Sequence, residues 1–236
     1  MAINQYRFGD KNAAELLQRS EKLAVKEGYT LFKQINDELI KLPEPSEQGI
    51  HQFALKNLEQ YLKRLHEKAK IRPSCHAECS ACCTHPVWTT HAELDIIQAY
   101  IRDSLSAELQ ERLTANLREW HLQIGQEASN LKVGDQDGQY RYIAKQVLCP
   151  LLLNDSCCIY PVRPVACRVY YSYGNPKDCA APGPVPAAAS FDCAIRNVYL
   201  LSSANVIRKY FRGTAREDYH FQRFSKSILL PLALTV

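Results

Sequence analysis

The sequence predicts a mainly α-helical protein of a single domain, in which cysteine-rich loops form a metal-binding knot that includes one short hairpin. Three observations lead to this prediction. Apolar residues recur at three- and four-residue steps through most of the chain. Eight of the ten cysteines fall in two short stretches. The total of 236 residues is enough for one domain that packs its own core without disulfides.

We divide the domain into three consecutive parts. Residues 1–72 form N-terminal helices, residues 73–173 form the cysteine region with inserted helices, and residues 174–236 form a basic, helical C-terminal part. No internal repeat or low-complexity tail interrupts them.

The sequence of residues 1–72 predicts two helical segments. One carries apolar residues from 13 to 40 and stops before Pro43 and Pro45. The second carries an apolar face from 50 to 65, and Pro73 ends it. Because the connection between them is short, we expect the two helices to pack antiparallel.

Two further helices are predicted inside the cysteine region. Thr90 and Glu93 have the spacing of a capping box, so a helix should begin there, and a second should begin near Ser106. Residues 130–139 are expected to form a polar loop. Its DxDG motif lacks the remaining ligands of a calcium loop, which favours a plain turn.

The segment from Cys149 to Tyr160 contains an apolar triplet and a turn at Asn154–Ser156, which predicts a short hairpin, or two extended arms, with Cys149 and Cys157 side by side. One helical turn within 163–170 should present Cys167. Residues 174–188 are rich in proline and are expected to form an irregular loop, followed by a helix over 189–211.

The first cysteine stretch has the pattern Cx3Cx2CC and comprises Cys75, Cys79, Cys82 and Cys83. Gaps of two and three residues let a tight turn direct successive thiolates at one metal ion or cluster. The second stretch contains Cys149–Pro150, Cys157–Tyr160, Arg163–Pro164 and Cys167–Arg168. Together the two stretches predict a metal site.

The sequence also favours a reducing compartment. No secretory signal follows Met1, and no apolar run approaches the length of a membrane span. We therefore expect a cytoplasmic protein that does not enter a membrane, with cysteines serving as metal ligands. A set of disulfides is the alternative.

Charge is unevenly placed along the chain. The net charge is +4, and from Cys157 onward ten Lys and Arg residues face four acids. Such a segment suits an acidic protein partner or nucleic acid. We favour instead a solvated helix face that also compensates an anionic thiolate cluster.

Several enzyme classes lack their motifs here. The glycines never occur as GxG, so neither a dinucleotide fingerprint nor a P-loop is present. HExxH and GxSxG are absent as well, and hydrolase chemistry is therefore unsupported.

The two cysteine stretches resemble the YkgJ-type cysteine cluster family, a zinc- or iron-chelating CxxCxxCC domain. The resemblance covers Cys75 to Tyr170. It implies that seven cysteines ligate metal: Cys75, Cys79, Cys82, Cys83, Cys149, Cys157 and Cys167. The same domain occurs in proteins similar to flagellin lysine methylase, which is associated with an iron–sulfur cluster.

Three cysteines fall outside the matched set. Cys158 stands where the family pattern has a small residue, so we expect a bystander. Either Cys179 or Cys193 could provide an eighth ligand. We prefer Cys193, because it lies at the start of a predicted helix.

Seven thiolates exceed the four that one zinc ion or one cubane cluster needs. The site would hold more than one centre, or some of the cysteines would lie outside the coordination sphere. Arg163 and Arg168 flank Cys167 and are predicted to offset thiolate charge and donate hydrogen bonds to sulfur. Solvation at the surface is the alternative for both.

Ligand type does not separate iron from zinc. An all-thiol ligand set and the methylase-like relatives favour a [4Fe-4S] cluster, with zinc as the alternative, in which His76 or His85 could replace a thiolate. Four tyrosines are expected to form an apolar wall beside the site: Tyr160, Tyr170, Tyr171 and Tyr173.

The expected function is a cytoplasmic metal-binding protein that acts in redox chemistry or in protein modification resembling methylation, on a protein partner or substrate. The alternative is a zinc-stapled structural or chelating module that binds a partner.

Overall fold

The computed structural model is mostly helical and describes the following residues: 22, 30, 33–39, 41, 46–70, 73, 75, 76, 78–172, 188–190, 223 and 227–234. The mainly α-helical class is thereby confirmed. The longer helices are α2 (Glu47–Ala69), α3 (His91–Ser104), α4 (Ala107–Asn130) and α5 (Gln136–Ala144). Shorter ones are the 3-10 helix η2 (Tyr160–Val162), α6 (Val165–Val169) and α9 (Leu230–Leu234).

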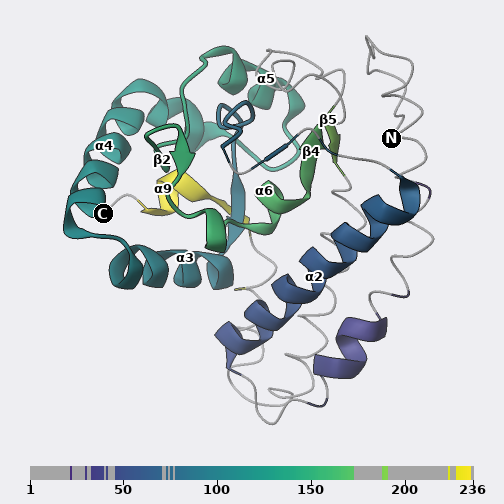
Figure 1. Ribbon diagram of the computed structural model, residues 1–236. Helices are drawn as coiled ribbons and strands as arrows, with labels where there is room; N and C mark the ends of the chain where they lie inside the picture. The colour runs from purple at the N-terminus through teal and green to yellow at the C-terminus, as the bar shows by residue number, and fades with distance from the viewer. Residues whose placement is uncertain are drawn as a thin grey trace.

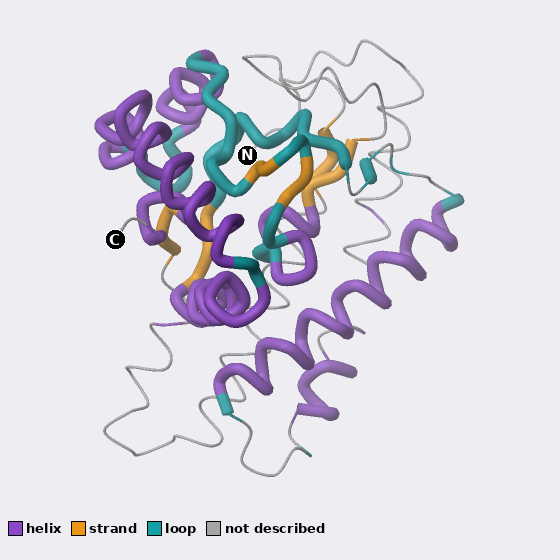
Figure 2. Tube along the Cα trace, turned by 60° about the vertical axis from the view of Figure 1, so that its left-hand side comes forward, coloured by secondary structure: helices purple, strands orange, loops and turns teal. Residues whose placement is uncertain are grey.

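The described strands form three antiparallel pairs of short strands. They are β1 (Trp88–Thr90) with β6 (Ser227–Leu229), β2 (Leu152–Leu153) with β3 (Ser156–Cys157), and β4 (Tyr170–Ser172) with β5 (Ala188–Ser190). Figures 1 and 2 show α3 to α5 on one side, α2 on the other, and the loops and strands between them.

Helix α2 confirms the apolar face predicted from residue 50 onward. Ser46 caps its start, because the Ser46 hydroxyl accepts a hydrogen bond from the Gly49 amide at 3.0 Å. Ile50, Ala54 and Leu58 are buried on one face. The helix contacts α3 and α6, and it therefore packs against the element that carries Cys167.

The capping box of α3 is also confirmed. The Thr90 hydroxyl accepts a hydrogen bond from the Glu93 amide at 3.2 Å, and the Glu93 carboxylate accepts one from the Thr90 amide at 2.8 Å. Helix α4 begins as expected after Ser106, whose hydroxyl accepts from the Leu109 amide.

The predicted loop over 130–139 is partly wrong, because α5 already begins at Gln136. The Asp135 carboxylate caps the helix by accepting a hydrogen bond from the Gly138 amide at 2.9 Å. A Cβ at Gly138 would collide with that carboxylate, so glycine is needed for the cap. The DxDG motif thus begins a helix.

The C-terminal expectations lie mostly outside the described residues. Two described segments differ from the helical part that we expected: Ala188–Ser190 forms a strand at the expected end of a loop and start of a helix, and Ser227–Leu229 forms a strand before the short helix α9. The pairing of Ala188–Ser190 with Tyr170–Ser172 joins residues that are distant in sequence, so local periodicity does not predict it.

Two apolar clusters form the core around α4. The larger joins α3, α4, the β2–β3 hairpin and α9: Leu94, Ile97, Leu113, Leu117, Leu151, Ile159, Leu230 and Leu234. The smaller surrounds Trp120 and Tyr142 on α4 and α5. Among the described helices, none combines the length and the apolar character needed to cross a membrane.

Candidate metal centre

The first cysteine stretch folds as a series of tight turns before β1. The amide of Cys79 donates to the His76 carbonyl at 3.0 Å, that of Cys83 to the Ser80 carbonyl at 2.9 Å, and that of His85 to the Cys82 carbonyl at 3.0 Å. These bonds satisfy the backbone locally and place several half-buried thiols on one short loop.

The second stretch folds as the predicted hairpin. Asn154 and Asp155 both have positive φ, 51° and 60°, and they form the two-residue turn between β2 and β3. Leu152 is the residue directly opposite Cys157, so Cys149 lies just before the paired strands. The prediction of a hairpin is confirmed.

One backbone hydrogen bond joins the two stretches. The Cys149 amide donates to the Cys83 carbonyl, with a nitrogen–oxygen distance of 2.6 Å. This bond holds the start of the hairpin against the end of the first loop, although α3, α4 and α5 separate the two in sequence.

Helix α6 carries Cys167, as expected for a single turn of helix. Pro164, the N-cap residue that precedes α6, makes no side-chain hydrogen bond that would cap the helix. The Glu93 carboxylate does so from α3, accepting a hydrogen bond from the Val165 amide at 2.7 Å. The position of Cys167 therefore depends on α3.

Electrostatic coupling shows which thiols lie near one another. The pKa of Cys83 is raised to about 12, first by burial and then by the charges of Cys149, Cys157 and Cys79. Burial raises the pKa of Cys149 to about 12, with smaller increases from Cys157, Cys158 and Cys82.

Cys167 belongs to the same group. Burial raises its pKa well above the ordinary value, and the charges of Cys82, Cys149 and Cys157 raise it further. Thiols of the loop, the hairpin and α6 are thus close enough to disfavour one another's ionisation. We define the thiol group as the coupled cysteines that the sequence pattern also predicts as ligands: Cys79, Cys82, Cys83, Cys149, Cys157 and Cys167. Cys158 couples to Cys149 and Cys157 as well but lies outside that pattern.

The chemistry of these thiols is suitable for binding a metal, but their side chains are not arranged around a common metal position. Within the described part of the chain no cysteine forms a disulfide, and sulfur is a preferred ligand of both zinc and iron–sulfur clusters. Within the described ranges, however, no three Cys, His, Asp or Glu side chains are arranged to hold a metal ion. The sulfurs would have to shift to complete a coordination sphere.

The two predicted arginines have different surroundings. Arg163 stacks over the Tyr160 ring at 4.0 Å, and its charge lowers the pKa of Cys157 against the larger effect of burial. Its Nε is buried and has no hydrogen-bond partner among the residues that the structure describes. The Nε of Arg163 is therefore a hydrogen-bond donor that lies near Cys157 of the thiol group.

Arg168 is buried, with 4% of its surface exposed, and its hydrogen bonds go to oxygen. Nε donates to the Arg163 carbonyl and Nη2 to the Pro161 carbonyl, both at 2.7 Å, while Nη1 pairs with Glu59 of α2. The predicted bonds of Arg168 to sulfur stay a prediction. Its recorded contacts hold α2, η2 and α6 together.

The other predicted residues flank the thiol group or fall outside the described part. Cys75 is half-buried and His76 is exposed, whereas the His85 ring packs edge-on against Tyr170 with centroids 5.3 Å apart. Cys158 packs against the larger core cluster, and burial raises its pKa to about 12. Tyr173, Cys179 and Cys193 lie outside the described residues.

Sequence reasoning missed two buried polar residues: Glu93, in its role as the cap of the helix that carries Cys167, and His51. The sequence pattern indicates Glu93 only as half of a capping box, and no motif includes His51. Burial lowers the pKa of His51 to about 4, an effect that Glu93 opposes and Arg168 reinforces. A polar residue at position 51, on the apolar face of α2, was the available signal.

Comparison with known proteins gave no match: none among protein-family models, curated proteins or solved structures.

Proposed function

We propose that this protein binds metal through the thiol group, as an iron–sulfur cluster, and acts in redox chemistry or protein modification. The observation that carries the proposal is the gathering of six cysteine thiols from three separate segments. Buried thiols that repel one another when ionised need a cation if they are to persist as thiolates. The resemblance to cysteine cluster proteins favours iron and a protein substrate.

The ligands would come from the thiol group, with Cys75 and Cys193 as the remaining candidates. A bound cluster would supply one-electron chemistry or a site for orienting a cofactor. The chain's own contribution begins with the thiols, which must lose their protons in order to ligate. Arg163 favours ionised Cys157 and has its buried Nε available beside the group.

Anaerobic purification followed by metal analysis and visible spectroscopy tests this proposal. We expect about four irons per chain and a broad absorbance that bleaches on reduction, as for a thiolate-held cubane cluster. Stoichiometric zinc in a colourless protein would favour the alternative, a zinc-stapled module that binds a partner. Protein that takes up neither metal after reconstitution would contradict both.

A pair of neighbouring variants tests the ligand assignment. Cys157→Ser should lose most of the bound metal, because it removes a predicted ligand that couples to three other members of the thiol group, Cys83, Cys149 and Cys167. Cys158→Ser should keep it, because the resemblance to cysteine cluster proteins places Cys158 outside the ligand set, although Cys158 packs against the same apolar cluster as Cys157. Equal metal content in the two variants would show that the assignment is wrong.

A further inference from the structure

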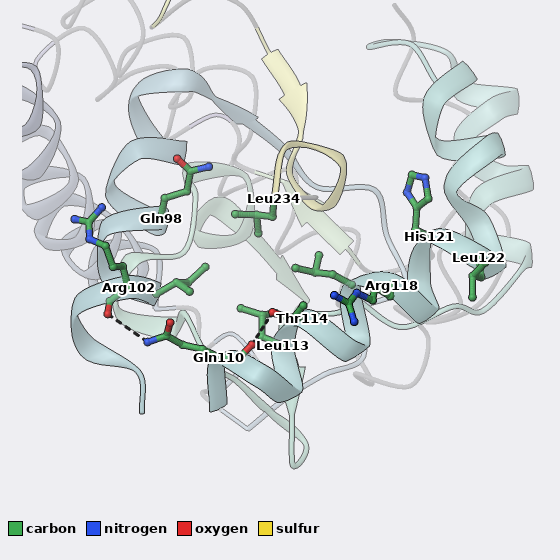
Figure 3. A pocket seen from close by; sticks show the side chains of 11 residues that line it. Gln98, Arg102, Gln110, Leu113, Thr114, Arg118, His121, Leu122 and Leu234 are labelled. Atoms are coloured by element: carbon green, nitrogen blue, oxygen red, sulfur yellow. Dashed lines mark hydrogen bonds between the residues drawn. The ribbon is translucent and has the colours of Figure 1, made fainter. Parts of the chain in front are cut away.

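A groove with a volume of about 1050 Å³ lies along α4, where α3 and α9 face it. Figure 3 shows side chains of all three helices around this hollow, with Gln98 and Arg102 at one end and His121 and Leu122 at the other. Nothing in the proposed metal chemistry uses this groove.

The floor of the groove is apolar. Leu113, Leu117 and Leu234 line it and are at most 9% exposed. Leu122 extends the same apolar surface at the rim but is 83% exposed. Together, Leu122 and the floor of the groove form an apolar surface that an apolar ligand could bury.

The charged residues that line the groove are all basic. Its ionisable lining residues are Arg102, Arg118 and His121, and no carboxylate lines it. Arg102 pairs with the neighbouring Asp103 at 2.7 Å. Arg118 forms no ion pair or hydrogen bond with any residue in the described part of the chain. The groove therefore complements an anionic group, with Arg118 as its available cation.

The dimensions favour a peptide. From Gln110 to Leu122 the lining follows α4 for about 18 Å, given a rise of 1.5 Å per residue, which is the length of three helical turns. Thr114, Arg118 and Leu122 are exposed, so one side is open to solvent. Amphipathic helices bind in such grooves by burying their apolar face.

We propose that this groove binds an amphipathic, acidic segment of a partner protein. Leucine-like side chains of that segment would cover Leu122 and the floor, and its carboxylates would face Arg118. Binding does not require metal at the thiol group, so the two proposals can fail separately.

The test uses a fluorescein-labelled helical peptide of about fourteen residues, with leucines on one face and glutamates on the other. Fluorescence anisotropy should show binding by the full-length protein and at least about tenfold weaker binding of a peptide with lysine in place of glutamate. Arg118→Glu should weaken binding about fivefold, and Leu122→Ala by a similar factor.

Matched controls lie away from the groove. Arg141→Glu changes an exposed arginine on α5, and Val133→Ala shortens an apolar side chain that is 57% exposed. Both variants should bind the glutamate peptide as the wild type does. Circular dichroism should show the same helix content in all four variants.

Three results would overturn the proposal. The glutamate peptide could fail to bind, it could bind equally well to the groove variants and the wild type, or the lysine peptide could bind equally tightly. Binding of dodecanoate that weakens in Arg118→Glu, without peptide binding, would assign the groove to a small amphipathic anion instead.

Discussion

At the scale of single residues, His51 shows how burial sets a protonation state. It is 1% exposed on α2, and burial lowers its pKa to about 4. In the unfolded chain the same imidazole would bind a proton near pH 6.5. The folded protein therefore holds His51 neutral throughout the range in which the unfolded chain becomes protonated.

Stability should consequently fall as the pH decreases. Between about pH 6.5 and pH 4 the unfolded state binds the additional proton, which removes up to about 3 kcal/mol of the free energy of unfolding. Urea unfolding at pH 7 and pH 4.5 measures this loss. The loss should be smaller in His51→Gln than in the wild type.

Burial also lowers the pKa of His66 to about 4, so part of the pH dependence should remain in His51→Gln. The contribution of His51 is therefore the difference between this variant and the wild type. An identical pH dependence in His51→Gln and the wild type would show that His51 does not titrate as described.

At the scale of elements, Glu93 connects two helix starts. One carboxylate oxygen accepts hydrogen bonds from the Thr90 amide, the Thr90 hydroxyl and the Thr89 hydroxyl at the start of α3. The other accepts from Val165 at the start of α6. The five-residue helix that carries Cys167 is thus capped by a residue 72 positions earlier in the chain.

Replacing Glu93 by Gln should reduce the free energy of unfolding by about 1–3 kcal/mol, because an amide hydrogen would face buried donors. The Val165 amide should also exchange its hydrogen faster. Urea unfolding and hydrogen exchange measure these effects.

Glu108→Gln provides the control, since Glu108 is an exposed first-turn glutamate of α4 and should change stability by less than about 0.5 kcal/mol. Equal costs for the two variants would contradict the role assigned to Glu93.

At the scale of the whole molecule, the C-terminal segment completes the core. Strand β6 pairs with β1, and α9 contacts both α3 and α4. Leu230 is 1% exposed within the larger core cluster. Residues that lie far apart in the chain, such as Leu94 and Leu230, therefore share one core.

Leu230→Ala should lower the free energy of unfolding by about 2–5 kcal/mol, through lost burial and the cavity left behind. Leu122→Ala removes the same atoms from an exposed side chain and should change the free energy of unfolding by less than about 0.5 kcal/mol. Denaturant titration compares the two. Similar losses would mean that α9 does not complete the core as described.

Local patterns predicted the local features of this molecule. The Thr90–Glu93 cap, the start of α4 after Ser106 and the β2–β3 hairpin each depend on residues a few positions apart, and all three are confirmed. The second partner of Glu93 and the Glu59–Arg168 pair depend on tertiary packing, which no local pattern encodes.

The candidate site divides in the same way. The spacing and the family resemblance identified the cysteines as candidate ligands, and the electrostatic coupling among them supports their proximity in the fold. Whether they ligate a metal stays a prediction. The pairing of β1 with β6 was also missed, because apolar residues at 228–234 do not indicate which strand they will meet.

The bond between Cys83 and Cys149 has a consequence for synthesis. A ribosome that adds about 5–20 residues per second needs roughly 3–13 seconds to pass from one cysteine to the other. During that interval the nascent chain carries the first four thiols without their partners from the hairpin. Oxidants and adventitious metals thus meet an incomplete set of thiols in every newly made molecule.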